Sequence, residues 1–362
     1  MSMMKFCGHI ARVLMIISFC GCQLRPVTES DTISLVGEDI VVPEDFTGGL
    51  SAVLANDTIY FNSFDPEYKF VVGSIENDTV VPYDSVLKVG QGPGEVLDAA
   101  LFKENGGEVY AIVRTSNRAI SMMKKIELNH RVIEHEVSNF DSIKGYVTFG
   151  GNNSAVFTSD STILFLGGRL SELTGMFSII DLKKGTIESV NFFPEDGVNC
   201  LPRTKFLIYS TNGYLASNNH GQYLYEMGFN KFAFIFHLNN GEIEIEKWLF
   251  DEYPKYSQSD EIGNFKYEPE VEKIDVYVTD SHIYVLQKDL DQTGRKSNDF
   301  ADSFNGNKVA VFDWEGNKVA AYDLDAFGYK IFVDKDETML YLEQIGNASS
   351  DYGIRKYKLP KQ

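Results

Sequence analysis

Five loop arginines are the most distinctive set of charged side chains in this sequence. The chain after residue 21 contains eight arginines, and five of them lie in segments that we expect to be loops on one face of the fold: Arg114, Arg118, Arg169, Arg203 and Arg295. Arginine binds carboxylates and sulfates through paired hydrogen bonds. This pattern therefore suggests a site for an anionic ligand. The alternative is that the arginines form ordinary surface ion pairs with the surplus acids.

Aromatic side chains gather in one of two long segments expected on the same face. Residues 251–271, "DEYPKYSQSDEIGNFKYEPEV", include Tyr253, Tyr256, Phe265 and Tyr267, and the second long segment is 288–307. Loops of this length are usually functional or disordered. Aromatic rings with polar tips suit a sugar-like ligand, so we interpret these tyrosines as candidate binding residues.

Residues for catalysis or metal binding are sparse. None of the six histidines has zinc-motif spacing, and His220 is the one that we expect in a loop beside the arginines. "DLDQTG" begins like a calcium loop with Asp289 and Asp291, but Phe300 occupies the position of the final acidic ligand, so chance in an acidic loop is the simpler reading. We expect no cofactor and assign no catalytic residue.

The stretch "GQGPGE" resembles a phosphate loop only in its glycines. A Walker loop needs Lys and Ser or Thr after its last glycine, whereas Gly94 is followed by Glu95. A dinucleotide-binding fingerprint needs a different glycine spacing and a following helix. We interpret the segment as a turn of the chain, made by Gly90, Gly92, Pro93, Gly94 and Glu95.

Composition favours a single all-β domain. The chain has 362 residues, of which 13% are aromatic, and aromatic residues are enriched in strands. Its formal net charge is -19, and removal of residues 1–21, which hold Lys5 and Arg12 but no acid, gives -21. An excess of negative charge repels polyanions, so nucleic acid is excluded as a partner.

One strand pattern recurs six times. Anchor positions in the copies are Tyr60, Tyr110, Leu164, Leu215, Tyr284 and Tyr341, spaced by 50, 54, 51, 69 and 57 residues. Each copy has a strand before its anchor, and five copies continue into a hairpin, three of which have Asn-Asp, Asn-Gly or Gly-Asn at the tip. A period near 50 residues predicts a six-bladed β-propeller of four-stranded antiparallel blades. A sandwich or a β-helix predicts no such recurrence.

The sixth copy lacks a fourth strand. The run "ISLVGEDIVVP", residues 33–43, is expected to supply it and to close the ring. The domain thus extends over 33–362.

The N-terminus reads as an export signal. Residues 1–21 have a basic start and a short apolar run, too short to span a bilayer as a helix. "FCGC" resembles the lipobox of bacterial lipoproteins, with Gly21 before Cys22. That resemblance implies that Cys22 carries the lipid and that residues 22–32 form a tether. An ordinary cleaved signal is the alternative.

Together, the signal and "GQGPGE" between the first two blades resemble the TolB-like six-bladed propeller lipoproteins of Bacteroidetes. The resemblance implies the fold and a place in the cell envelope, at the outer membrane; the lack of an acidic run after Cys22 favours the periplasmic side. We expect a non-catalytic module that binds a glycan fragment, an anionic ligand or an envelope protein. The alternative is a propeller lyase or hydrolase that uses His220 and the arginines at the channel mouth.

Overall fold

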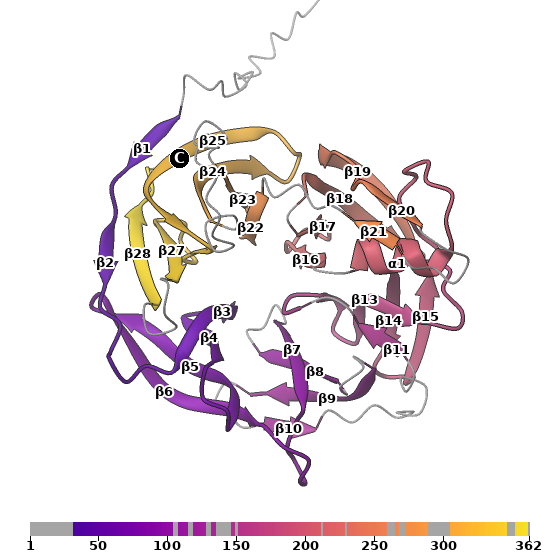
Figure 1. Cartoon of the computed structure of the whole chain (residues 1–362), viewed down its shortest axis with the longest axis horizontal. Coiled ribbons are helices and arrows are strands. Elements are labelled where there is room, and N and C mark those ends of the chain that lie inside the picture. Colours follow the sequence, from indigo (N-terminus) through magenta and orange to yellow (C-terminus); the bar gives the residue numbers. More distant parts are fainter. Residues whose placement is uncertain are drawn as a thin grey trace, which may run out of the picture.

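Six sheets stand around a central axis in the computed structural model, as Figure 1 shows. The structure describes residues 32–103, 108–114, 119–127, 132–134, 146–148, 151–210, 213–228, 230–258, 265–267, 273–288, 305–345 and 352–360. In every blade the first strand lines the axis and later strands lie progressively further out. The predicted six-bladed propeller is confirmed.

The first three blades follow one another along the chain. Blade one contains β3 (Gly48–Ala55), β4 (Thr58–Ser63), β5 (Tyr68–Glu76) and β6 (Thr79–Lys88). Blade two contains β7 (Asp98–Lys103), β8 (Val109–Arg114), β9 (Ile120–Ile126) and β10 (Val132–Glu134). Blade three contains β12 (Ala155–Ser159), β13 (Thr162–Arg169), β14 (Phe177–Asp181) and β15 (Thr186–Val190), with β11 (Tyr146–Thr148) paired to β13.

The last three blades complete the ring. Blade four contains β16 (Gly213–Ser217), β17 (Tyr223–Met227), β18 (Phe232–Asn239) and β19 (Glu242–Asp251). Blade five contains β22 (Lys273–Val278), β23 (His282–Gln287), β24 (Gly306–Asp313) and β25 (Lys318–Gly328). Blade six contains β26 (Lys330–Val333), β27 (Met339–Ile345), β28 (Tyr352–Lys358) and β2 (Glu38–Ile40).

Local chemistry explains the hairpins. Asn77 and Asp78 at the β5–β6 tip have φ of 48° and 61°, and Asn240 and Gly241 at the β18–β19 tip have 51° and 84°. Short hairpins need positive φ, which Asn, Asp and Gly tolerate best. These tips therefore set the pairing of the strands that they join.

The core lies between neighbouring blades. Val72 of blade one and Leu101 of blade two belong to one buried cluster, and Phe177 of blade three packs within another against Phe236 of blade four. Burial of an aliphatic or aromatic side chain of this size contributes about 1.5–3 kcal/mol. Sheet-to-sheet packing thus stabilises the ring at every blade boundary.

Blade four differs from the expectation in one respect. The strand expected before the anchor Leu215 corresponds to the run "KFLIYS", residues 205–210, but this run belongs to α1 (Pro202–Ser210), and β16, which contains Leu215, is the innermost strand. Proline suits the first turn of a helix, so Pro202 was the missed signal. Placing the anchor on Tyr225 in β17 changes the spacings of 51 and 69 to 61 and 59.

The N-terminal segment closes the ring and reaches further than expected. β2 pairs antiparallel with β28, as predicted, but β1 (Ile33–Leu35) pairs in parallel with β25 of blade five. Beyond β2, Val41 exchanges backbone hydrogen bonds with Asp78 and Val80 of blade one. Residues 33–41, called the clasp below, therefore join blades five, six and one.

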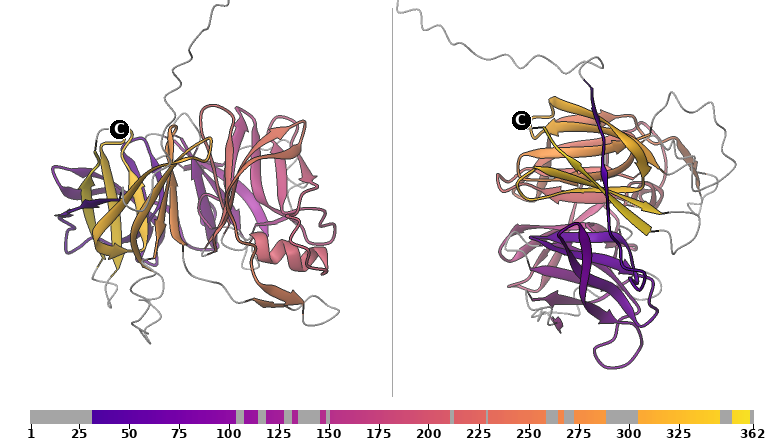
Figure 2. Two further views of the ribbon diagram at one scale, coloured as in Figure 1. Left: turned by 90° about the horizontal axis from the view of Figure 1, so that it is seen from above. Right: turned by 90° about the vertical axis from the view of Figure 1, so that its left-hand side faces the viewer.

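The two ends of the ring differ. The interblade connections form one face, called the insertion face, which carries α1 and the hairpin of β20 (Tyr256–Gln258) and β21 (Phe265–Tyr267) (Figure 2). Turns between first and second strands form the opposite face, called the turn face. Among the described residues, no helix is long and apolar enough to cross a membrane.

Candidate functional site

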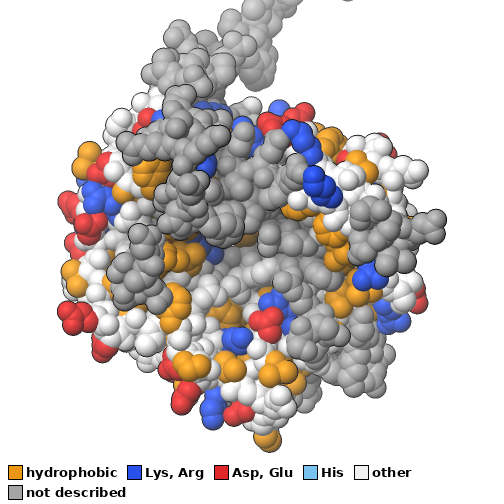
Figure 3. All heavy atoms as spheres, in the orientation of Figure 1, with side chains coloured by type: hydrophobic (Ala, Val, Ile, Leu, Met, Phe, Trp, Pro, Cys, Tyr) orange, Lys and Arg blue, Asp and Glu red, His pale blue; other side chains and the backbone are white. Residues whose placement is uncertain are grey.

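Three candidate arginines lie on the insertion face, each in its own setting. Arg114 ends β8, is 9% exposed, and places Nη2 2.9 Å from Oδ2 of Asp98. Arg169 ends β13 and lies 5.0 Å over the Tyr146 ring, and Arg203 is exposed in α1. Among the described residues that Figure 3 shows, lysine and arginine side chains are interspersed with acidic ones and do not form one patch.

Tyr253 and Tyr256, in the connection between blades four and five, contact other residues of the insertion face. Tyr256 donates its hydroxyl hydrogen to Oδ2 of Asp196 at 2.5 Å, and the Tyr253 ring packs against Phe232 and Trp248. Both side chains therefore have partners within the protein.

Asp196 is the centre of this arrangement, and sequence reasoning missed it. Its side chain is fully buried, lies 2.9 Å from Nζ of Lys205, and accepts hydrogen bonds from Tyr209 and Tyr256. Burial alone would raise the pKa of Asp196, but these contacts outweigh it and lower the pKa below its usual value. The carboxylate ties α1 to β20.

His220 does not lie with the arginines. It occupies the turn between β16 and β17, on the turn face, because α1 displaced the strands of blade four from their expected phase. The proposed grouping of His220 with the arginines is therefore wrong. Arg118, Arg295, Asp289 and Asp291 lie outside the described residues.

"GQGPGE" connects β6 to β7. The Glu95 carboxylate folds back over the segment, accepts the Gly92 N–H at 2.8 Å, and lies 3.3 Å from Nζ of Lys88. A Cβ on Gly90 would come within 1.9 Å of Oε2 of Glu95. The backbone hydrogen bond from Gly92, helped by Lys88, lowers the pKa of Glu95. A carboxylate held over this segment would repel a phosphate.

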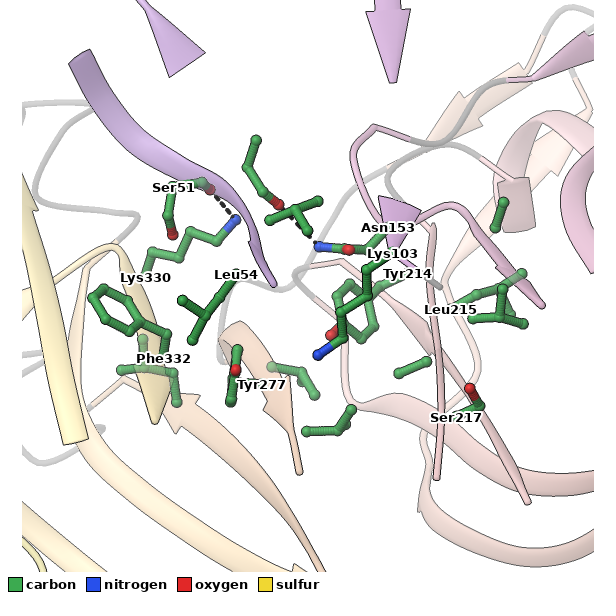
Figure 4. Close-up of a pocket in the computed structure, with 18 residues that line it drawn as sticks. Ser51, Leu54, Lys103, Asn153, Tyr214, Leu215, Ser217, Tyr277, Lys330 and Phe332 are labelled. Carbon is green, nitrogen blue, oxygen red and sulfur yellow. Dashed lines mark hydrogen bonds between the residues drawn. The ribbon is translucent and has the colours of Figure 1, made fainter. Parts of the chain in front are cut away.

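A cavity of about 460 Å³ lies at the centre of the turn face. First strands and turns of five blades line it, and it continues into a narrower space of about 60 Å³ that all six blades line. Figure 4 shows Lys103 and Tyr277 among the side chains that line this channel. Ligand pockets commonly have volumes of about 300–1,000 Å³, so the cavity is the candidate site.

Asn153 lies across the channel near the insertion face. Its side-chain nitrogen donates to the Ala52 carbonyl of blade one at 3.1 Å, its backbone N–H donates to Leu101 of blade two, and its carbonyl accepts from Leu215 of blade four. Asn153 has φ of 58°, a conformation that asparagine tolerates better than most residues. These bonds fix one end of the channel.

Polar side chains surround the mouth. Glu337, which has φ of 53°, accepts hydrogen bonds from Thr279 and Tyr284 at 2.7 and 2.9 Å and lies 2.5 Å from Nδ1 of His282. Burial alone would raise its pKa, but these contacts lower it. Glu337 therefore joins the turns of blades five and six.

Lys103 projects into the mouth from the end of β7, where its side chain is exposed to the cavity. The surrounding protein removes much of the bulk water around the ammonium and lowers the pKa of Lys103, while Asp280 opposes this shift. Sequence reasoning missed Lys103, although it is the last residue of "DAALFK", and the first strand of each blade lies beside the axis. Among the described residues, no group of His, Cys, Asp or Glu is arranged to hold a metal ion.

Comparisons with solved structures found similar propellers. A protein of unknown function from Bacteroides thetaiotaomicron is 12% identical, with a TM-score of 0.48, over 89% of this chain and 75% of that one. An auxiliary nutrient binding protein from Bacteroides ovatus is 10% identical, with a TM-score of 0.46, over 91% of this chain and 78% of that one. A gluconolactonase from Xanthomonas campestris is 9% identical, with a TM-score of 0.44, over 91% of this chain and 88% of that one. A search of the curated proteins found no match.

A family model described as TolB-like 6-blade propeller-like matches residues 56–336, from the turn after β3 to the turn before β27. The match covers more than half of the chain and includes strands of all six sheets. The chain therefore belongs to the family of TolB-like six-bladed propellers.

Proposed function

We propose that this propeller is a non-catalytic binding module whose ligand site is the channel mouth on the turn face. The observation that carries the proposal is the cavity of about 460 Å³, in which polar side chains from several blades converge. Asn56, Ser217 and Asn219 offer hydrogen-bond donors and acceptors around the mouth. This arrangement supports binding of a glycan fragment, an anionic ligand or an envelope partner protein.

A blocking substitution tests the site. Ser217→Trp would fill the mouth with an indole ring, whereas Ser171→Trp adds the same ring at an exposed position on the insertion face. We would measure saturation-transfer NMR with glucose, glucuronate, N-acetylglucosamine and trialanine. The expected result is that at least one solute binds to the wild type and to Ser171→Trp but not to Ser217→Trp. Equal binding to all three proteins, or to none, contradicts the proposal.

We also propose that the domain is anchored at the outer membrane by lipid on Cys22, on the periplasmic side. β1, where the described part of the N-terminal segment begins, pairs with the outermost strand of blade five and does not line the channel. Palmitate labelling in a bacterial host tests the anchor: the label should be lost in Cys22→Ala and kept in Cys200→Ala. Label that persists in Cys22→Ala would contradict it.

A further inference from the structure

Lys103 and Lys335 are the two lysines that line the mouth, and Lys103 is the one that ends a first strand, β7. Among the described residues, no carboxylate oxygen lies within ion-pair distance of its Nζ, and no described group accepts a hydrogen bond from it. The negative charge of Asp280, in the β22–β23 turn that also lines the cavity, acts on this ammonium. A cation in a confined space without a paired anion is less stable than one in water.

The acids that share the mouth already have donors. Asp334 accepts the N–H groups of Thr338 and Met339 at 2.7 and 2.9 Å, and also the Thr338 hydroxyl. Asp280 accepts the Asn219 side-chain amide at 2.5 Å. With Glu337 held as described above, each described carboxylate that lines the mouth accepts hydrogen bonds that shape one turn or join the turns of two blades.

We propose that the channel mouth binds a small polyhydroxylated carboxylate, with the carboxylate on Lys103 and the hydroxyl groups toward Ser217, Asn56 and Tyr277. This inference rests on the proposed function and names its ligand class. The cavity has room for a ligand of monosaccharide to disaccharide size. The body of such a ligand needs hydroxyl partners, which these side chains supply.

The confined setting explains why an anion is favoured there. Charged hydrogen bonds are stronger where protein replaces bulk water, because the effective dielectric is lower. A bound carboxylate would also relieve the cost of holding the Lys103 ammonium away from bulk solvent. A neutral sugar of the same shape cannot do either.

Glucose and glucuronate make a matched pair of probes, since they differ only at C6, where glucuronate has the carboxylate. Calorimetry at pH 7 should show glucuronate binding at least about tenfold tighter than glucose, as expected for one charge-assisted hydrogen bond. Lys103→Met should abolish that preference, and Lys103→Arg should keep most of it. Lys358→Met, which removes an exposed lysine of β28 outside the cavity lining, should change neither affinity.

Inorganic phosphate separates a carboxylate site from a general anion site. If phosphate binds more tightly than glucuronate and depends on Lys103, the carboxylate assignment is overturned. Lack of glucuronate binding to the wild type, or equal affinities in wild type and Lys103→Met, overturns the role of Lys103. Glucose that binds as tightly as glucuronate, and is lost in Ser217→Trp, would leave the proposed site intact while rejecting this ligand class.

Discussion

The Asp196 carboxylate joins parts of the insertion face that are separate in the sequence. Asp196→Asn keeps the size of the side chain but removes the charge that faces Lys205, and the amide has one oxygen fewer for the Tyr209 and Tyr256 hydroxyls. We expect this change to lower the free energy of unfolding by about 2–4 kcal/mol, because the largely buried Lys205 ammonium loses its opposite charge and keeps only the Pro194 carbonyl as acceptor. Urea unfolding measures the loss.

The same pair of proteins gives a pH test. The pKa of Asp196 is lowered in the folded state, so its contribution is present above the unfolded-state pKa of about 4 and is lost as pH falls through the folded value. The stability difference between wild type and Asp196→Asn should therefore shrink between about pH 5 and pH 3. Asp160→Asn, at an exposed turn, is the control and should be nearly neutral. A difference that does not change with pH would argue against an ionised Asp196.

Individual site residues were harder to predict from sequence than the strands that carry them. The arginines attracted attention because their side chains bind anions well, yet Arg114 is occupied by Asp98. The sequence gives no reason to select Lys103, because a lysine at the end of a strand is common, and its place in the channel depends on how six blades bring their first strands to one axis. The environment of a charge depends on distant segments, and a single sequence does not show that environment.

The two strands of the clasp are expected to contribute unequally to stability. Ile40 in β2 is 5% exposed and packs in a cluster with Phe61 and Ile354, whereas Ile33 in β1 is 43% exposed. Ile40→Ala should cost about 2–4 kcal/mol through lost burial and the remaining cavity. Ile33→Ala should cost less than about 1 kcal/mol, as an exposed substitution.

Denaturant unfolding followed by tryptophan fluorescence compares the two variants. If Ile33→Ala is as destabilising as Ile40→Ala, the parallel strand on blade five contributes to closure as much as the strand in blade six. The clasp also has ionic contacts: Arg355 contacts Asp39 and Asp325, and Lys356 contacts Glu38 and Asp78. They bridge the same three blades from β28.

Strands with a local signal were predicted well, and elements whose nature depends on packing were not. Hairpins are recognisable from the alternation of apolar and polar residues in their strands and from the Asn, Asp and Gly residues at their tips. "KFLIYS" has an apolar run too short to distinguish a strand from a helix, and its Phe206 and Tyr209 are buried in α1. That one misassignment moved His220 from one face of the ring to the other.

At the scale of the molecule, repetition made the architecture readable. Each blade is a local antiparallel unit, so its period survives in the sequence. Long connections correctly indicated the insertion face, but length alone does not say where a cavity opens. The cavity lies at the short turns, where there is little sequence to interpret. Its polarity follows from which residues happen to end each first strand.

Ring closure also has a consequence for biosynthesis. The partner of β2 is β28, at residues 352–358. β2 is synthesised early and β28 late, so β2 cannot pair until nearly all of the domain has left the ribosome. Until then Ile40 lacks the neighbour Ile354, and an unpaired strand edge invites aggregation. A nascent chain of this protein is thus an open arc during most of its synthesis, and its need for chaperones should end only when the final strand emerges.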